Sequence, residues 1–215
     1  MTASALPSKE PLRLGVLISG TGTNLGAILS AVREARLDAR VELVISNKPG
    51  VLGLERATAA AVPTRVLSHK EFPSREAFDA AIVEALRAAR VDVVVLAGFM
   101  RVVTAVLLDA FPDRVINVHP ALLPAFPGVD AQAQALSYGV SVTGCTVHFV
   151  DQGVDTGPII LQRTVAVYAS DDRDALAKRI LVEEHLALVE ALQLLVERRV
   201  SVLRAPGQRA RVVRT

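Results

Sequence analysis

Short apolar segments alternate with helical patterns along the first half of this 215-residue chain. Residues 12–19 and 91–97 are strongly apolar and have the length of strands that are covered on both faces of a sheet. Residues 24–35 lie between such segments and carry apolar side chains at helical spacing. Because strands that alternate with helices form parallel sheets, this order predicts a doubly wound α/β fold. The same pattern predicts further strands at 41–46, 64–67 and 115–118 and further helices at 52–61 and 74–89.

The second half of the chain follows a different pattern. Residues 143–150 and 159–167 have the pattern of paired strands, and the loop that joins them carries Asp155. A long helix is expected at 173–198. We therefore expect a Rossmann-like, doubly wound, mostly parallel sheet with an antiparallel C-terminal strand pair. The expected organisation is an N-terminal extension at 1–11, one folded domain at 12–200 and a basic C-terminal tail at 201–215.

Composition and charge argue against several classes of protein. The 24 cationic and 22 anionic residues nearly cancel, which leaves a net charge of +2. The C-terminal end is rich in arginine, but it lacks the interleaved aromatic residues of a surface on which bases stack. We therefore expect a solvated tail and no nucleic-acid partner. No apolar run approaches the roughly 18 residues that span a bilayer, so no membrane association is expected.

The single cysteine and the N-terminal sequence add two further expectations. Cys145 allows neither a disulfide framework nor a thiolate zinc site, and within an apolar strand it is expected to be a small core residue. The chain does not begin with a basic segment followed by an apolar one, so we expect no signal peptide and a cytoplasmic protein.

Unusual loops directly follow three of the predicted strands. These loops are 19–24, 98–101 and 117–120. In open α/β sheets, ligands bind beyond the carboxyl ends of the strands, near the place where strand order reverses. We therefore expect the three loops to lie at one edge of the sheet and to form a site.

The loop at 19–24 is rich in glycine and threonine and leads into a helix. Glycines let the backbone approach a ligand closely, and hydroxyl groups together with helix N-terminal amides form an anion site. The alternative is a tight turn whose helix is capped by Thr23 or Asn24. The loop has no lysine at its end, which argues against a nucleoside triphosphatase.

Asn117, His119 and Asp155 supply an amide, an imidazole and a carboxylate in turn-forming surroundings. An amide and an imidazolium can both stabilise a developing oxyanion, and a nearby carboxylate is expected to raise the imidazole pKa above about 6.5. This set suits acyl transfer to an amine without a covalent enzyme intermediate. The alternative is that the asparagine bonds the local backbone and that the histidine is a loop residue.

The three remaining histidines and a proline-rich loop carry weaker signals. His69 is expected to be exposed, His148 to point to the other sheet face and to be at most a lining residue, and His185 to lie on a helix surface. No pair of histidines has metal-ligand spacing, so no metal is expected. The prolines at 120–127 would hold His119 rigidly, and the sequence leaves open whether Leu123–Pro124 is cis.

The segments 19–24, 96–101 and 117–120 and Asp155 together resemble the phosphoribosylglycinamide formyltransferase family. Further matching stretches are 72–76, 142–150 and 183–185, and the resemblance extends from residue 12 to about 195. It implies the formyltransferase fold and transfer of a formyl group from 10-formyltetrahydrofolate, a co-substrate, to the amine of phosphoribosylglycinamide in purine biosynthesis. Residues 12–200 would then be the catalytic domain.

The resemblance also implies roles for individual residues. Asn117 and His119 would face the formyl oxygen, with His119 as the proton donor and Asp155 keeping it charged. The residues implied to bind phosphoribosylglycinamide are Gly22, Thr23, Asn24 and Glu184. Those implied at the formyl folate site are Arg75, Met100, Arg101, Val102, Val103, Asn117, Asp151 and Asp155. The implied partners are small molecules, and the protein would be a monomer or a homodimer.

One departure and three alternatives accompany the resemblance. Gln132 stands where the family commonly has a histidine, which puts an auxiliary polar contact in doubt. Methionyl-tRNA formyltransferase carries a further C-terminal domain and formyltetrahydrofolate hydrolase a further N-terminal one, and we expect neither domain here. A non-catalytic nucleotide-binding module would explain the fold and the glycine loop, but not the combination of Asn117, His119 and Asp155.

Overall fold

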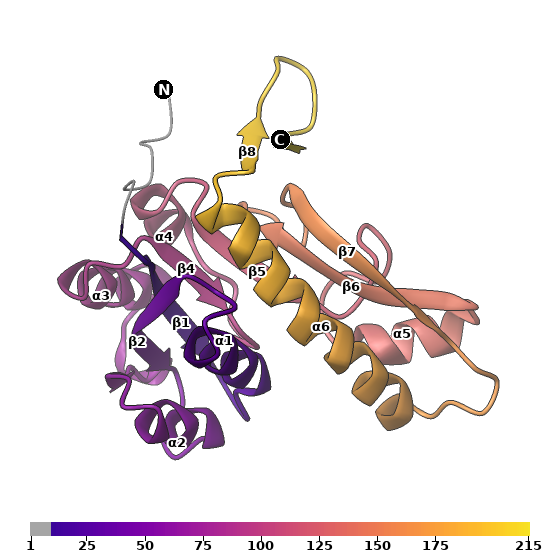
Figure 1. The fold of residues 1–215 in the computed structure, drawn as a ribbon, viewed down its shortest axis with the longest axis horizontal. Coiled ribbons are helices and arrows are strands. Elements are labelled where there is room, and N and C mark those ends of the chain that lie inside the picture. The colour runs from indigo at the N-terminus through magenta and orange to yellow at the C-terminus, as the bar shows by residue number, and fades with distance from the viewer. Residues whose placement is uncertain (1–9) are drawn as a thin grey trace. The chain divides into compact units, whose positions relative to one another are not determined.

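A computed structural model describes residues 10–215 (Figure 1). Residues 1–9, which form most of the predicted N-terminal extension, lie outside this range. The chain divides into two compact units, one up to Ile116 and one from Asn117 to Thr215. In the described residues, seven strands form a sheet in the order β3-β2-β1-β4-β5-β6-β7. This confirms the predicted doubly wound, mostly parallel sheet.

The first unit contains the parallel strands β1 (Leu12–Ile18), β2 (Ala39–Ser46), β3 (Thr64–Val66) and β4 (Val93–Leu96). β1 pairs with β2 on one side and with β4 on the other. The chain runs outward from β1 through β2 to β3 and then returns to β4, so the strand order reverses between β1 and β4. The loops after β1 and β4 therefore lie at the position where such sheets bind ligands.

The helices of this unit are α1 (Thr23–Arg33), α2 (Leu52–Ala59), α3 (Arg75–Ala88) and α4 (Ala105–Ala110), with the 3₁₀ turn η1 at His69–Glu71. α1 contacts α2, and α3 contacts α4. The Ser74 hydroxyl caps α3 by accepting a hydrogen bond from the Ala77 N–H at 3.1 Å, as its side-chain type predicts. Large apolar side chains of β1, among them Leu14, Leu17 and Ile18, are fully buried.

The second unit contains the antiparallel pair β6 (Val142–Phe149) and β7 (Ile159–Ala166), with α5 (Ala131–Tyr138) and α6 (Arg173–Val196). β5 (Val115–His119) begins in the first unit and ends in the second. The predicted antiparallel C-terminal pair is thereby confirmed. α6 contacts both β6 and β7 through a buried face that includes Leu188 and Leu192. Within residues 10–215, no helix has the length and apolarity needed to cross a bilayer.

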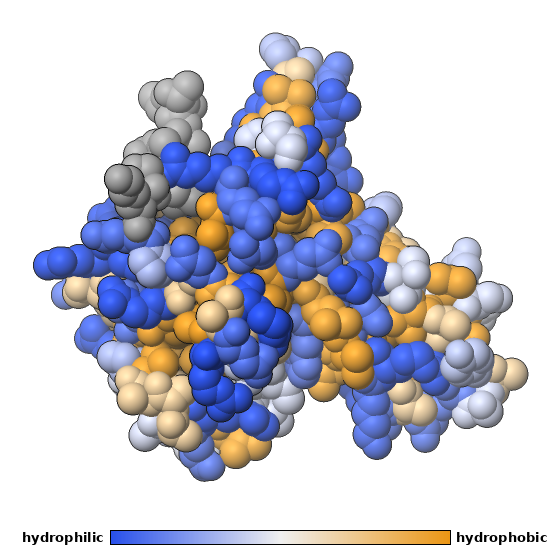
Figure 2. Space-filling model, viewed as in Figure 1, coloured by the Kyte–Doolittle hydropathy of each residue, from blue (hydrophilic) through white to orange (hydrophobic). Residues whose placement is uncertain are grey.

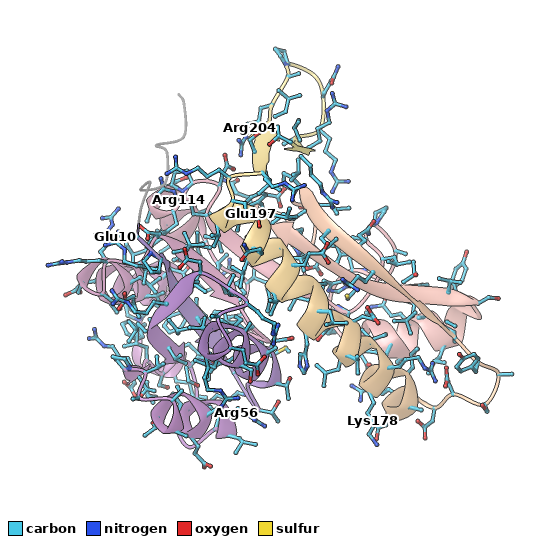
Figure 3. The ribbon with its side chains drawn as sticks, viewed as in Figure 1. Glu10, Arg56, Arg114, Lys178, Glu197 and Arg204 are labelled. Carbon is cyan, nitrogen blue, oxygen red and sulfur yellow. The ribbon has the colours of Figure 1, made fainter. Side chains whose placement is uncertain are left out.

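Most residues of the predicted basic tail at 201–215 are exposed to solvent, as expected, but the segment has regular secondary structure. Residues of this segment form the hairpin β8 (Val200–Leu203) and β9 (Arg211–Arg214), and β9 contacts β7. The guanidinium groups of Arg209 and Arg214 donate to the carbonyls of Thr156 and Ile160. The hairpin surface is mostly hydrophilic (Figure 2), and Arg204 extends from it (Figure 3). The arginines dominated the sequence pattern, although the backbone of the segment pairs as a hairpin.

Candidate active site

Asn117, His119 and Asp155 lie together in the second unit. Asn117 and His119 lie in β5, with His119 as its last residue, and Asp155 lies in the loop between β6 and β7. His119 Nδ1 is 3.3 Å from Asp155 Oδ2, and Asn117 Nδ2 is 3.3 Å from His148 Nε2. His148 Nε2 is in turn 3.7 Å from Asp155 Oδ1. The structure therefore brings together the three residues that the sequence singled out and adds His148 to them.

The His119 ring is enclosed between two oxygen acceptors. It is only 4% exposed, and its Nε2 donates to the Phe126 carbonyl at 2.8 Å while Nδ1 faces Asp155. A neutral imidazole carries one N–H, so only the protonated ring can donate to both oxygens. The geometry therefore favours the imidazolium, but the burial opposes it.

The predicted direction of the His119 pKa shift was wrong. Burial lowers the pKa of His119 by more than the Phe126 carbonyl and Asp155 raise it. The sequence pointed to the carboxylate, but it could not show how completely the ring is removed from water. In the protein without substrates, His119 is therefore a stronger acid than an ordinary histidine.

Asp155 is held as a carboxylate by the donors around it. Burial raises its pKa, but the adjacent His148, the hydrogen bond from the Gly128 N–H and the charge of His119 outweigh the burial, so the pKa lies below its ordinary value. The Gly128 N–H donates to Oδ2 at 2.8 Å. The Asp155 backbone has φ 54°, in the left-handed region that L-residues rarely adopt. The loop thus holds this carboxylate in a specific position.

His148 is the residue of this cluster that the sequence analysis undervalued. It is buried at the end of β6, and its Nδ1 is 2.8 Å from the Phe149 carbonyl. The His148 Nε2 lies 3.3 Å from the Asn117 amide nitrogen, so this contact limits the orientations open to that amide. A register shift between Val147 and His148 interrupts the regular β6–β7 pairing.

The glycine loop after β1 is held by backbone and side-chain bonds within the first unit. The Gly53 N–H donates to the Gly20 carbonyl at 3.1 Å, and Arg56 of α2, labelled in Figure 3, donates from Nε to the Thr21 carbonyl at 2.9 Å. Gly22 has φ 67°, and a Cβ there would come within 2.6 Å of the Gly53 Cα. Only glycine therefore fits this turn.

The first turn of α1 is suited to an anion. Gly22 occupies the N-cap position without a side-chain hydrogen bond, and the first turn contains no acidic residue. The alternative of a capping Thr23 or Asn24 is therefore wrong for this helix. Asn24 itself is buried in α1. The N-terminal amides of the helix and its dipole favour negative charge at this position.

The loop after β4 carries the predicted folate-site residues 100–103 and is fixed at both ends. The Met100 N–H donates to the Ser19 hydroxyl at 2.8 Å. The N–H and hydroxyl of Thr104 donate to Asp79 Oδ2 at 2.5 and 2.8 Å. Between these anchors Met100 is 69% exposed, and Val102 is also exposed. Apolar side chains that are held exposed in this way suit a flat, apolar ligand.

The remaining predicted site residues have different surroundings. Arg101 is half-buried, Val103 is buried, and Arg75 is exposed at the first position of α3. Glu184 is buried in α6. The exposed Asp151 shapes its own loop, since its Oδ1 accepts from the Gly153 N–H at 3.1 Å and from the Thr156 hydroxyl at 2.6 Å.

The two remaining histidines and Gln132 are half-buried, whereas Cys145 is buried. His69 is half-buried rather than exposed and lies edge-on to Phe78 at 6.3 Å between ring centroids. His185 and Gln132 are half-buried on helices. Burial raises the pKa of the Cys145 thiol to about 12, as fits a core residue rather than a nucleophile. Leu123–Pro124 is cis. Within residues 10–215, no three histidine, cysteine or acidic residues are grouped as a metal site would require.

The doubly wound fold and the buried imidazole beside a carboxylate and an amide fit the class of enzymes that stabilise an oxyanion during group transfer. Comparison with known proteins identifies the family. Residues 12–192 match the formyl transferase family, and the chain belongs to it.

Individual relatives agree with this family. The chain is 53% identical over 191 residues to the trifunctional purine biosynthetic protein adenosine-3 of Drosophila melanogaster, but it spans only 14% of that protein. It is 42% identical over 173 residues to the phosphoribosylglycinamide formyltransferase of Bacillus subtilis. The matched region covers 80% of this chain and 89% of the Bacillus subtilis protein. The crystal structure of glycinamide ribonucleotide transformylase 1 from Symbiobacterium toebii has 51% identity and a TM-score of 0.90, with 96% of each chain covered.

Proposed function

We propose that this chain transfers the formyl group of 10-formyltetrahydrofolate to the amine of phosphoribosylglycinamide. The observation that carries the proposal is the buried contact between His119 and Asp155, 3.3 Å apart, in the same cluster as Asn117. Membership of the formyl transferase family supports the reaction type. The likeness to the Bacillus subtilis enzyme over most of both chains supports the acceptor.

The reaction needs a group that stabilises negative charge and a route for one proton. The acceptor amine forms a bond to the formyl carbon, and the carbonyl oxygen becomes an oxyanion in a tetrahedral intermediate. The Asn117 amide and protonated His119 donate to that oxygen, which is the largest single contribution that such sites make. The bond from carbon to the folate nitrogen then breaks, and the amine proton passes to the departing nitrogen.

The lowered pKa of His119 fits this role. A charged ring with a lowered pKa gives up its proton more readily to the developing oxyanion, and the charge that appears on that oxygen offsets the burial that disfavours the imidazolium. Asp155 remains ionised and favours the charged ring at the moment when negative charge appears beside it. The catalytic residues are therefore Asn117, His119 and Asp155, with His148 orienting the Asn117 amide.

The two substrates are assigned to the remaining predicted residues. The anion site at the start of α1 takes the phosphate of phosphoribosylglycinamide through Gly22, Thr23 and Asn24, and Glu184 contacts the same substrate. The formyl folate, a co-substrate, contacts the loop after β4 and residues in other parts of the chain. These residues are Arg75, Met100, Arg101, Val102, Val103 and Asp151, together with Asn117 and Asp155. We further propose a cytoplasmic monomer or homodimer whose domain at 12–200 needs no metal.

The test follows the absorbance change as 10-formyltetrahydrofolate loses its formyl group. We expect loss only when phosphoribosylglycinamide is present, and a loss at least about 10²-fold slower in the Asp155→Asn variant. Loss of equal rate without the acceptor would indicate a hydrolase instead. No loss under either condition would contradict the proposal and leave a binding protein.

A further inference from the structure

The loop at 120–130, hereafter the proline loop, supplies backbone groups to both members of the catalytic pair. The Phe126 carbonyl accepts from His119 Nε2 at 2.8 Å, and the Gly128 N–H donates to Asp155 Oδ2 at the same distance. The two contacts come from residues only two positions apart in the loop. A small displacement of this segment would therefore change the surroundings of both side chains at once.

The backbone of this segment is not held by regular secondary structure. Phe126, Gly128 and Asp130 have φ angles of 53°, 82° and 53°, all in the left-handed region. Residues in this region persist only when the surrounding structure holds them there. Val129 is 83% exposed, so packing of its side chain contributes little. Other contacts must keep the segment in place.

Gln134 of α5 supplies such contacts. Its Nε2 donates to the Pro127 carbonyl at 3.1 Å and to the Val129 carbonyl at 2.9 Å. These two carbonyls flank Gly128 on either side, and one amide group has the two N–H donors that they require. The side chain thus bridges the backbone on both sides of the residue that contacts Asp155.

We propose that Gln134 is a positioning residue that holds the Phe126 carbonyl and the Gly128 N–H against His119 and Asp155. The inference rests on the proposed function for its catalytic meaning. Gln134 contacts neither catalytic side chain, so it acts only through the backbone of the proline loop. The titratable groups that face this loop are His119, His148 and Asp155, Tyr138, whose ring centroid lies 5.8 Å from that of Phe126, and Asp130, which is paired with Arg173 at 2.7 Å.

Two substitutions separate hydrogen-bond donation from packing. Gln134→Ala removes the side chain, whereas Gln134→Glu keeps its length but replaces the donors with acceptors. Gln193→Ala is the matched control, because Gln193 lies on α6 of the same unit and donates from Nε2 to Glu197 at 2.8 Å. All three variants are compared with the wild type for kcat, for both KM values and for thermal stability.

We expect both Gln134 variants to lower kcat by about 10-fold or more, since small displacements in a catalytic site are costly. Both KM values should stay within about 2-fold, because no substrate-binding residue is altered. The pH range over which kcat is high should become narrower at both its acid and its alkaline end. Loss of the Gly128 N–H bond raises the pKa of Asp155, and loss of the Phe126 carbonyl contact lowers that of His119. Gln193→Ala should change neither kcat nor the profile.

A measurement that needs no formyl transfer separates this proposal from the proposed function. Titration of the imidazole nitrogens by NMR, with His119 identified by its absence in His119→Gln, should give a lower His119 pKa in Gln134→Ala, which removes the contacts without adding a charge. That shift in a protein without transfer activity would overturn the proposed function and leave the positioning role intact. If the Gln134 variants match Gln193→Ala in kcat, profile and His119 titration, Gln134 is not a positioning residue.

Discussion

Two buried aspartates, one in each unit, meet opposite electrostatic surroundings. Asp79 in the first unit is 2% exposed and accepts two hydrogen bonds from the uncharged Thr104. Burial raises its pKa, and these bonds do not offset the burial. Asp155 in the second unit is 11% exposed at its side chain, but His119, His148 and the Gly128 N–H together hold its pKa below the ordinary value.

The difference follows from the groups around each carboxylate, since burial raises the pKa of both and only the groups around Asp155 outweigh it. Asp79 anchors a loop and needs no charge for that task. Asp155 has to be a carboxylate if it is to stabilise a protonated histidine. We accordingly propose that the first unit contributes loop anchoring and the anion site, and that the chemical step takes place in the second unit, which also contributes substrate contacts. The following predictions test that division, beginning with the largest expected effect.

Removal of charge should affect turnover at Asp155 but not at Asp79. We expect Asp155→Asn and His119→Ala each to lower kcat by at least about 10²-fold, the scale of losing an oxyanion donor, while the fold stays intact. Asp79→Asn keeps an oxygen acceptor for Thr104 and should leave kcat within about 3-fold. Steady-state kinetics and circular dichroism of the three variants provide the measurement. Near-normal turnover of Asp155→Asn would remove Asp155 from the mechanism.

Truncation of Asp79 should reduce stability and folate binding. Asp79→Ala leaves the buried N–H and hydroxyl of Thr104 without their acceptor, which costs about 1–3 kcal/mol in the free energy of unfolding. The loop after β4 then loses one of its anchors, so KM for the formyl folate should rise. Urea unfolding and kinetics test both effects, with Asp79→Asn as the control. Equal stability of the Ala and Asn variants would argue against the anchoring role.

Truncation of Asn24 should weaken one substrate selectively. We expect Asn24→Ala to raise KM for phosphoribosylglycinamide by about 10-fold, the scale of one charge-assisted hydrogen bond, with little change in KM for the folate. Steady-state kinetics with each substrate varied in turn provide the test. Equal weakening of both substrates would contradict an anion site at the start of α1.

The pH dependence of stability should report the burial of His119. Its pKa in the folded protein is lowered, so the unfolded chain binds a proton that the folded protein resists. Stability should therefore fall as the pH drops below about 6.5, the ordinary histidine value. The pKa of Asp155 in the folded protein is also lowered. Its contribution to stability is therefore present above about 3.9, the ordinary aspartate value, and is lost as the pH falls through the folded-state pKa.

The measurement is urea unfolding of the wild type and of His119→Gln between pH 7.5 and 5. We expect a smaller loss of stability on acidification in the variant. A parallel loss in both proteins would mean that His119 is not responsible and that its ring is better hydrated than the structure indicates.

Strong periodicity made most of the fold predictable. The strands of the parallel sheet and the helices α1, α2, α3 and α6 were found because their apolar residues recur at regular spacing. The helices α4 and α5 were missed, since α4 has only six residues and α5 begins with alanine and glutamine in alternation rather than with apolar residues at helical spacing. The β8–β9 hairpin was missed because its many arginines indicated solvent exposure, and cationic side chains do not exclude strand pairing at an edge.

The sequence alone determined the order of strands and helices, the glycine turn before α1 and the choice of Asn117, His119 and Asp155. These follow from local periodicity, from the demands of backbone geometry and from the chemistry of side-chain types. Only the tertiary structure decided the place of His148, the contacts from Phe126 and Gly128, and the lowered pKa of His119. Those features depend on burial and on backbone groups from separate segments, which no local pattern encodes.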